Sequence, residues 1–421
     1  MGEAVPYGCL QSVMPKDIFG ARNVGSGAGP SRMKMHSMEP EHDQSDRKSL
    51  RVLQIAKYFD PDQGGIERVT HDLAYGLADQ GVQADVLCFG KRKYYAPYEA
   101  PFKVIRAPVC GQVFGKSVSI SYVKLVHRLS EHYDLALLHV PNPVGMASAL
   151  IGWKKPLAIF WHADVVGFQH LQGALRALEK ASVRQADLVL AATPAHVNGS
   201  YLADAIRPKA ATTPYPFDGT RLARLNAVTN LPEQVRAFAN GRPLVLAVGR
   251  LVPYKGFDVL VRAVTSATAS FAVCIAGGGD LQDELQQQAI ANGVSDRVIL
   301  VGPTQDGDLA QLYRDASIVV MPSTTRAEMY GIAQVEAMSH GCPVISTDIP
   351  MSGVSWVNVH GETGLVVTPK DPVALAIAID SLVNNRSLRQ RLAQGARRRY
   401  EETFSSYSTS KRYADLLRSI V

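Results

Sequence analysis

Cysteine is scarce in this sequence, and no two cysteines form a CxxC pair. Such usage excludes a disulfide framework and a cysteine-based metal site, and it is typical of free thiols in a reducing compartment. A large excess of one charge is also lacking, since 44 basic and 38 acidic side chains leave a net charge of +6. This mild balance argues against a nucleic-acid-binding protein. It suits an anionic small molecule or an anionic membrane surface.

Long apolar runs are equally lacking. A membrane-spanning helix needs about 20 consecutive apolar residues, and the most apolar stretch, residues 135–161, is interrupted by histidine, proline, asparagine and lysine. The first residues show no basic segment followed by an apolar core, so we expect no signal peptide. These features predict a cytoplasmic protein. Peripheral contact with the inner face of the plasma membrane stays open as an addition to that prediction.

What the sequence does contain is a long alternation of short apolar strands with helical segments. Residues 1–48 show neither period and predict a disordered tail. The alternation then runs through residues 49–220, weakens in a linker expected at 218–242, and restarts within residues 221–404. It predicts an α/β protein with two Rossmann-like, doubly wound domains that face a cleft. Strands are expected at 51–56, 85–89, 135–139, 157–161 and 188–192, and then at 244–248, 272–276, 298–301, 318–321 and 343–346.

Ligands of such sheets bind beyond the carboxyl ends of the strands, so the loops at these ends are the candidate sites. The loop after the first strand ends with Gly64 and Gly65 before an expected helix, and both glycines would let the backbone approach a ligand. Asp60 and Asp62 in the same loop have a metal-binding DxD spacing, although a solubilising role explains them better. His162 follows the fourth strand. There it could hydrogen-bond a sugar hydroxyl, assist proton movement or be structural.

The loop after the strand at 244–248 carries two cations between glycines. Arg250 offers a planar fork of donors and Lys255 a mobile point charge, and Gly249 and Gly256 flank them. Such a pair can hold a diphosphate and neutralise the charge that grows on it as it leaves. The following loop, residues 277–280, is rich in glycine. A phosphate cradle and a tight turn explain it equally well.

The most informative loop follows the strand at 318–321. It carries Glu328, and a helix is expected to start near Gly331 and to end at Gly341, which places Glu336 inside the helix. Carboxylates accept hydrogen bonds from neighbouring sugar hydroxyls, so the two glutamates indicate a ligand site with the first one facing the cleft. The backbone amides that would open towards a phosphate are those of Tyr330, Gly331 and Ile332.

Three of these segments together resemble family 4 of the glycosyltransferases. They are Gly64–Arg68, Gly249–Gly256 and Glu328–Glu336, the last with the family's Glu-x7-Glu spacing. The likeness covers about residues 50–400 and implies the GT-B fold, in which a C-terminal helix, here at about 405–421, packs back on the first domain. It also implies retaining transfer without a bound metal. The nucleotide-diphosphate sugar is then a co-substrate, and no cofactor is expected.

The same resemblance implies roles for single residues. Arg250 and Lys255 would bind the donor diphosphate, and Glu336 the ribose hydroxyls. Glu328 would contact the donor sugar and His162 would lie near the reacting carbon, so these two are the catalytic candidates. We expect front-face substitution, in which the leaving diphosphate accepts the proton of the acceptor. The glycines that would approach the donor phosphates are Gly64 and Gly65.

A finer likeness in residues 352–365 is to bacterial enzymes that build surface polysaccharides, lipopolysaccharide among them, often from GDP-linked mannose or rhamnose. GDP-mannose is therefore our preferred donor, with UDP-sugars as the alternative, and a glycan or lipid-linked saccharide is the expected acceptor. Tyr330 stands where phenylalanine is commoner in the family, and residues 216–218 depart from the family's usual sequence near the hinge.

Residues 116–132 combine basic and apolar side chains. A helix there could rest on anionic lipid or be an ordinary surface helix.

Other classes of function account for the sequence less well. A GT-B relative that hydrolyses or epimerises a nucleotide sugar would lack the paired Arg250/Lys255 and Glu328/Glu336 positions as a set. A non-catalytic scaffold would have lost some of these positions, and all are intact. An NAD-dependent dehydrogenase is the weakest alternative, because no strand-linked GxGxxG with a downstream acidic residue occurs.

Overall fold

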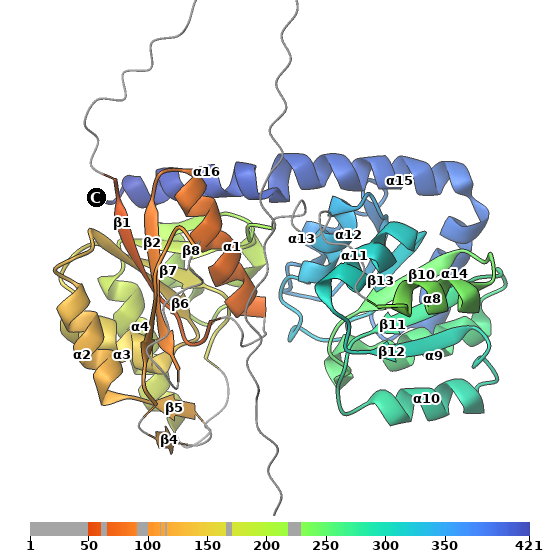
Figure 1. The fold of residues 1–421 in the computed structure, drawn as a ribbon, viewed down its shortest axis with the longest axis horizontal. Coiled ribbons are helices and arrows are strands. Elements are labelled where there is room, and N and C mark those ends of the chain that lie inside the picture. Colours follow the sequence, from red (N-terminus) through yellow and green to blue (C-terminus); the bar gives the residue numbers. More distant parts are fainter. Residues whose placement is uncertain are drawn as a thin grey trace, which may run out of the picture. The chain divides into compact units, whose positions relative to one another are not determined.

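The computed structural model describes residues 49–421 apart from 60–64, 91–99, 110, 114–115, 166–170 and 218–228. Within these ranges the chain forms two parallel β-sheets with helices packed against them (Figure 1). This arrangement confirms the predicted α/β class with two Rossmann-like sheets. In the same ranges no helix combines the length and the apolar character that crossing a bilayer requires.

The first sheet has the strand order β3-β2-β1-β6-β7-β8-β9, and all its neighbouring strands are parallel. Its central strands are buried along their whole length, which explains why they read as unbroken apolar runs. The order reverses between β1 and β6, the position at which open α/β sheets bind ligands. The strands are β1 (Arg51–Ile55), β2 (Gln83–Phe89), β3 (Val104–Ala107), β6 (Leu135–Val140), β7 (Leu157–Trp161), β8 (Leu188–Ala191) and β9 (Ala210–Thr212).

The second sheet has the order β12-β11-β10-β13-β14-β15 and is also parallel throughout. Its order reverses between β10 and β13, so the loops after these two strands meet at one edge. The strands are β10 (Leu244–Val248), β11 (Ala272–Ala276), β12 (Val298–Gly302), β13 (Ile318–Met321), β14 (Val344–Thr347) and β15 (Gly364–Val367). A separate antiparallel pair joins β4 (Gly111–Val113) to β5 (Lys116–Val118).

Helices connect the strands of each sheet and cover it. Those of the first sheet are α1 (Gly65–Asp79), α2 (Ile120–Leu129), α3 (Pro143–Gly152), α4 (Gln172–Gln185), α5 (Pro194–Asn198), α6 (Ala203–Ile206) and the turn η2 (Arg207–Lys209). Those of the second are α8 (Leu231–Ala239), η3 (Pro253–Lys255), α9 (Phe257–Ser266), α10 (Gln282–Ala291), α11 (Asp306–Asp315), α12 (Ile332–Ser339), α13 (Val354–Val357), α14 (Pro372–Asn384) and α15 (Arg386–Arg399).

The C-terminal helix returns to the first sheet. After α15 the chain passes through the π-helical turn η4 (Tyr400–Phe404) into α16 (Ser406–Arg418), which lies beside α1 although the two are far apart in sequence (Figure 1). A side chain at Gly76 would collide with Ser410, so the glycine permits this close packing. Tyr413 anchors α16 by donating its hydroxyl to the carbonyl oxygens of Thr213 and Pro214, at 2.8 and 2.9 Å.

Three details differ from the sequence-based expectation. The edge strands β3, β9 and β15 were not predicted, because three- or four-residue strands carry little periodicity. The expected linker at 218–242 contains α8, which packs against α11 with Arg236 donating to Asp315 at 2.8 Å. The expected basic helix over 116–132 is wrong at its start, since Lys116 belongs to β5 and the helix begins only at Ile120.

Candidate functional site

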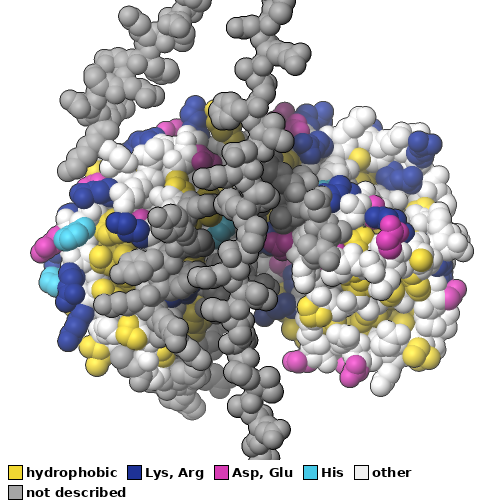
Figure 2. Space-filling view, in the orientation of Figure 1, with side chains coloured by type: hydrophobic (Ala, Val, Ile, Leu, Met, Phe, Trp, Pro, Cys, Tyr) yellow, Lys and Arg dark blue, Asp and Glu magenta, His cyan; other side chains and the backbone are white. Residues whose placement is uncertain are grey.

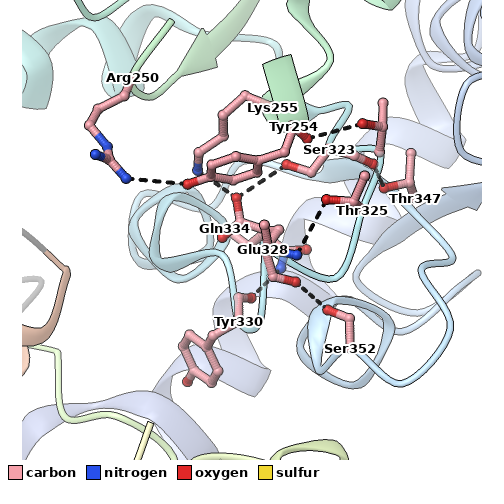
Figure 3. A network of polar contacts seen from close by, with 12 residues as sticks. Arg250, Tyr254, Lys255, Ser323, Thr325, Glu328, Tyr330, Gln334, Thr347 and Ser352 are labelled. Carbon is pink, nitrogen blue, oxygen red and sulfur yellow. Dashed lines mark hydrogen bonds and ion pairs between the residues drawn. The ribbon is translucent and has the colours of Figure 1, made fainter. Parts of the chain in front are cut away.

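A buried ion pair lies at the carboxyl edge of the second sheet. Lys255 Nζ, at the end of η3, is 2.5 Å from Glu328 Oε2, in the loop between β13 and α12 (Figure 3). Ser323 donates to the same carboxylate oxygen at 3.1 Å, and Ser352 donates to the backbone carbonyl of Glu328 at 2.5 Å. Glu328 lies in the expected loop and is buried among these donors. The two serines were missed by sequence reasoning.

Arg250, the other predicted diphosphate ligand, has a different setting. It is exposed, and its guanidinium reaches the Tyr254 hydroxyl at 3.5 Å (Figure 3). Gly256 holds the whole 249–256 loop against the loop of Glu328, because its φ is +69° and a Cβ there would lie 2.1 Å from the carbonyl oxygen of Pro322. The structure therefore brings Lys255 to Glu328 directly and leaves Arg250 accessible at the rim of the same loop.

The glycines of residues 277–280 serve loop packing. A Cβ on Gly277 would lie 1.9 Å from the Gly249 carbonyl oxygen, and one on Gly279 would lie 2.5 Å from that of Leu251. Two backbone hydrogen bonds, Gly249 N–H to Ala276 and Leu251 N–H to Gly278, tie these loops together at 3.0 Å. These contacts agree with the tight turn, and the phosphate cradle stays a prediction.

The start of α12 is shaped by Gly331. Its φ of +76° is accessible to glycine at little cost, and a Cβ there would lie 2.4 Å from Met321 Sδ. The side chain of Tyr330 turns away from the Lys255–Glu328 pair (Figure 3) and packs against Tyr215, with 4.6 Å between the ring centroids. Helix α12 then begins at Ile332, where its first backbone amides lie at the end that attracts anions.

Residues of both sheets meet at this helix. A Cβ on Gly65, the first residue of α1, would lie 3.6 Å from Ile332 Cδ1, so two of the predicted donor-binding residues are neighbours. A small cavity beside them is lined by Arg68, Asp72, Tyr215, Tyr330 and Ile332, among others. Gly64 and the Asp60/Asp62 pair lie outside the described residues. Elsewhere in the described ranges, no three His, Cys, Asp or Glu side chains come close enough to hold a metal ion.

Glu336 lies inside α12 and is buried. Tyr313 donates its hydroxyl to Glu336 Oε2 at 2.7 Å, and Arg68 Nη1 from α1 lies 3.9 Å from Oε1. Arg68 also lies 3.8 Å from Asp306. Burial lowers the pKa of Arg68, but these carboxylates outweigh burial and raise its pKa above the ordinary value. Arg68 stands in the segment Gly64–Arg68, yet sequence reasoning gave it no role of its own.

His162 is buried, and both of its ring nitrogens have protein partners. Nε2 lies 3.0 Å from His139 Nδ1, and Nδ1 lies 2.9 Å from the Tyr215 hydroxyl. Burial, and then the neighbouring imidazoles, lower the pKa of His162 well below its usual value, so the ring is neutral. Its surroundings therefore differ from those of a solvent-facing proton carrier. His139 lies near the end of the neighbouring strand β6, whereas His162 follows β7. A histidine near the end of each of two neighbouring strands is a signal by which the sequence could have revealed the pair.

Two parallel sheets and a C-terminal helix that returns to the first of them are the architecture of GT-B glycosyltransferases. The family model described as Glycosyl transferases group 1 matches residues 231–399, and the Glycosyl transferase 4-like domain matches residues 64–216. The chain belongs to family 4 of the glycosyltransferases and is a glycosyltransferase.

Relatives along nearly the whole chain agree with this assignment. D-rhamnosyltransferase WbpZ of Pseudomonas aeruginosa is 30% identical over 85% of this chain and 93% of its own length. The O-antigen chain mannosyltransferase C of Escherichia coli is 28% identical over 88% of this chain and 99% of its own length. Among solved structures, Anabaena Alr3699/HepE in complex with UDP has a TM-score of 0.71 at 23% identity, covering 88% of this chain and all of that one. At this identity the structural likeness shows the GT-B fold.

Proposed function

We propose that this glycosyltransferase moves a hexose, with retention of configuration, from a nucleotide-diphosphate sugar to a glycan or lipid-linked saccharide during the synthesis of a surface polysaccharide. Mannose or rhamnose carried by GDP is the preferred donor. The names of the two relatives, an O-antigen mannosyltransferase and a D-rhamnosyltransferase, support this choice of pathway and sugar. UDP-sugars are the alternative donors.

The observation that carries the proposal is the buried Lys255–Glu328 pair beside the Gly331 turn. A carboxylate held by Lys255 and Ser323 is oriented, as the recognition of sugar hydroxyls requires. The start of α12 offers backbone N–H groups to phosphate only a few residues away. A sugar and a phosphate bound next to each other are the parts of a nucleotide-sugar donor that react.

The remaining residues fit the rest of the donor. Glu336 would accept the ribose hydroxyls, and Arg250 and Lys255 would hold the diphosphate. In front-face substitution, the bond from the anomeric carbon to the diphosphate oxygen breaks as the acceptor oxygen bonds to that carbon. The acceptor proton passes to the departing diphosphate oxygen. Lys255, Arg250 and the amides at the start of α12 would stabilise the negative charge that develops there, and no metal ion is needed for this step.

The test of these roles is the doubly substituted variant Arg250→Ala with Lys255→Ala. Each donor group aimed at a developing charge contributes about 10²- to 10³-fold to the rate, so we expect kcat/KM to fall by about 10³-fold or more. Arg262→Ala is the matched control, because this exposed arginine on α9 pairs only locally with Asp258. Near wild-type activity in the double variant would rule the mechanism out.

The metal-free step predicts full transferase activity in EDTA. Dependence of that activity on added divalent metal would contradict the step.

Contact with membrane lipid is a further part of the proposal. On α2, Lys124, His127 and Arg128 are exposed, and Ile120 at its start exposes 71% of its surface. Basic, histidine and hydrophobic side chains lie together at the left edge of Figure 2, where Figure 1 places α2. Such a mixed surface suits anionic lipid. At low salt we expect the protein to bind anionic vesicles but not neutral ones. Equal binding to both would contradict the proposed contact with anionic lipid.

A further inference from the structure

A chain of four buried polar side chains starts at the switch point of the first sheet, where β1 and β6 lie side by side. Gln54 on β1 places Oε1 3.1 Å from Nε2 of His139 on β6. Nδ1 of His139 lies 3.0 Å from Nε2 of His162, whose own Nδ1 lies 2.9 Å from the hydroxyl of Tyr215. None of the four residues exposes more than 8% of its surface. The mechanism described above uses none of them, and the family resemblance gives a role only to His162, near the reacting carbon.

With Oε1 of its amide towards the ring, Gln54 sets the direction of the hydrogen bonds that follow. Its amide oxygen can only accept, so His139 donates from Nε2 and, as a neutral ring, accepts at Nδ1. His162 then donates from Nε2 to His139 and accepts at Nδ1, which makes the Tyr215 hydroxyl the donor to His162. Each ring nitrogen has one fixed role. An added proton would place two donors against each other.

Both rings are closed off from water. Phe160 stacks on His162 with 4.3 Å between the ring centroids, and Thr70 of α1, whose hydroxyl donates to the carbonyl oxygen of Ile66, lies 3.5 Å from His139 Nδ1. Removal from water opposes a positive charge on either ring. Burial lowers the pKa of His139 to about 3. For His162, burial, His139 and His196 of α5 all act in the same direction.

Tyr215, the last of the four hydrogen-bonded side chains, reaches the candidate donor site. Tyr215 packs against Tyr330 and lines the small cavity next to Ile332, together with Arg68 and Asp72 of α1. These last two are the charged groups among the lining residues, and the Asp72 carboxylate favours the charged form of Arg68. These four hydrogen-bonded side chains thus connect the switch point of the first sheet to the turn at which α12 begins.

We propose that Gln54 and His139 are positioning residues that hold His162 as a neutral ring protonated on Nε2, so that no imidazolium stands beside the anomeric carbon while positive charge develops there. Like charges a few ångströms apart in a poorly solvated site repel strongly, so a protonated His162 would oppose the reaction. The place of His162 near that carbon comes from the family resemblance and rests on the proposed function. Its protonation state does not.

The direct test is NMR spectroscopy of the full chain labelled with ¹⁵N-histidine. Long-range ¹H–¹⁵N spectra distinguish the two neutral tautomers and the charged ring without any substrate, and His139→Gln and His162→Gln variants assign the signals. We expect both histidines to remain neutral with the proton on Nε2 between about pH 5.5 and 8, although a free histidine titrates near pH 6.5. A His162 ring protonated on Nδ1, or one that becomes charged above about pH 6, would overturn the inference.

Gln54→Glu tests the consequence for the reaction, since the two side chains are nearly isosteric. A carboxylate beside His139 favours the charged imidazole by one pKa unit or more. The acid limb of the kcat/KM–pH profile should therefore move up by at least about one unit, while Gln282→Glu, an exposed counterpart on α10, leaves it in place. A profile lowered equally at all pH values, or not altered, would contradict the positioning role. Complete absence of transferase activity in the wild type would instead contradict the proposed function. It would not affect the protonation state of His162 measured by NMR.

Discussion

Lys255 and Glu328 stand 73 positions apart in the chain and depend on each other for charge compensation. Their side chains expose 14% and 10% of their surface, so neither is fully solvated by water. Breaking a fully buried pair costs about 3–5 kcal/mol because one charge is left uncompensated. With this partial exposure we expect Lys255→Ala and Glu328→Ala each to lower the free energy of unfolding by about 2 kcal/mol, and the double variant by clearly less than the sum. Urea unfolding of the four proteins measures this coupling, and simple additivity would contradict it.

Gly331 allows a second test at the scale of one residue. Gly331→Ala adds a Cβ 2.4 Å from Met321 Sδ at a φ of +76°, whereas Gly341→Ala adds one at a φ of +70° with open space around it. Left-handed backbone costs a non-glycine residue about 1–2 kcal/mol, so Gly341→Ala should lose about that much. Gly331→Ala should lose more stability and also weaken nucleotide binding, because the turn that starts α12 must shift. Equal losses in thermal and urea unfolding would show that the Met321 contact is unimportant.

Among the helices, α16 carries a buried hydroxyl that ties it to the first sheet. Tyr413 donates to two carbonyl oxygens next to β9, whereas Tyr407 of the same helix exposes 77% of its surface. Removing a hydroxyl that satisfies buried carbonyls costs about 1–3 kcal/mol. Tyr413→Phe should therefore speed hydrogen exchange along α16, and Tyr407→Phe should not. Unchanged exchange in Tyr413→Phe would mean that the hydroxyl does not hold the helix.

The sequence could predict the central strands and the type of fold, because parallel strands buried on both faces appear as unbroken apolar runs. It could not predict β9 or β15, whose few residues are only partly buried. Nor could it predict α8, whose proline and polar residues looked like a linker. Strand-end position identified Lys255, Glu328 and His162 as candidates. The pairing of Lys255 with Glu328 depends on how two loops pack, which no local pattern contains.

At the scale of the whole molecule, buried neutral histidines predict acid sensitivity. Burial lowers the pKa of His139 to about 3 and that of His196 to about 4, against about 6.5 in an unfolded chain. Between these values the unfolded chain binds more protons than the folded one, so stability falls as the pH falls below about 6.5. From pH 7 to pH 5 each such histidine should contribute a loss of about 2 kcal/mol. Urea unfolding at both pH values checks this, and an undiminished loss in His196→Gln would contradict it.

We propose that the loops of Lys255, Glu328 and Gly331 hold a nucleotide sugar whose sugar passes to a separate acceptor. The most direct measurement supplies radiolabelled GDP-mannose, GDP-rhamnose and UDP-glucose in turn to the purified protein with membrane lipid extracts, and follows the label into glycolipid. We expect transfer from one GDP-sugar, dependent on the lipid, and at least about a hundredfold loss in Glu328→Gln because its carboxylate no longer accepts the sugar hydroxyls. Release of free sugar without an acceptor, or undiminished transfer by Glu328→Gln, would contradict the account.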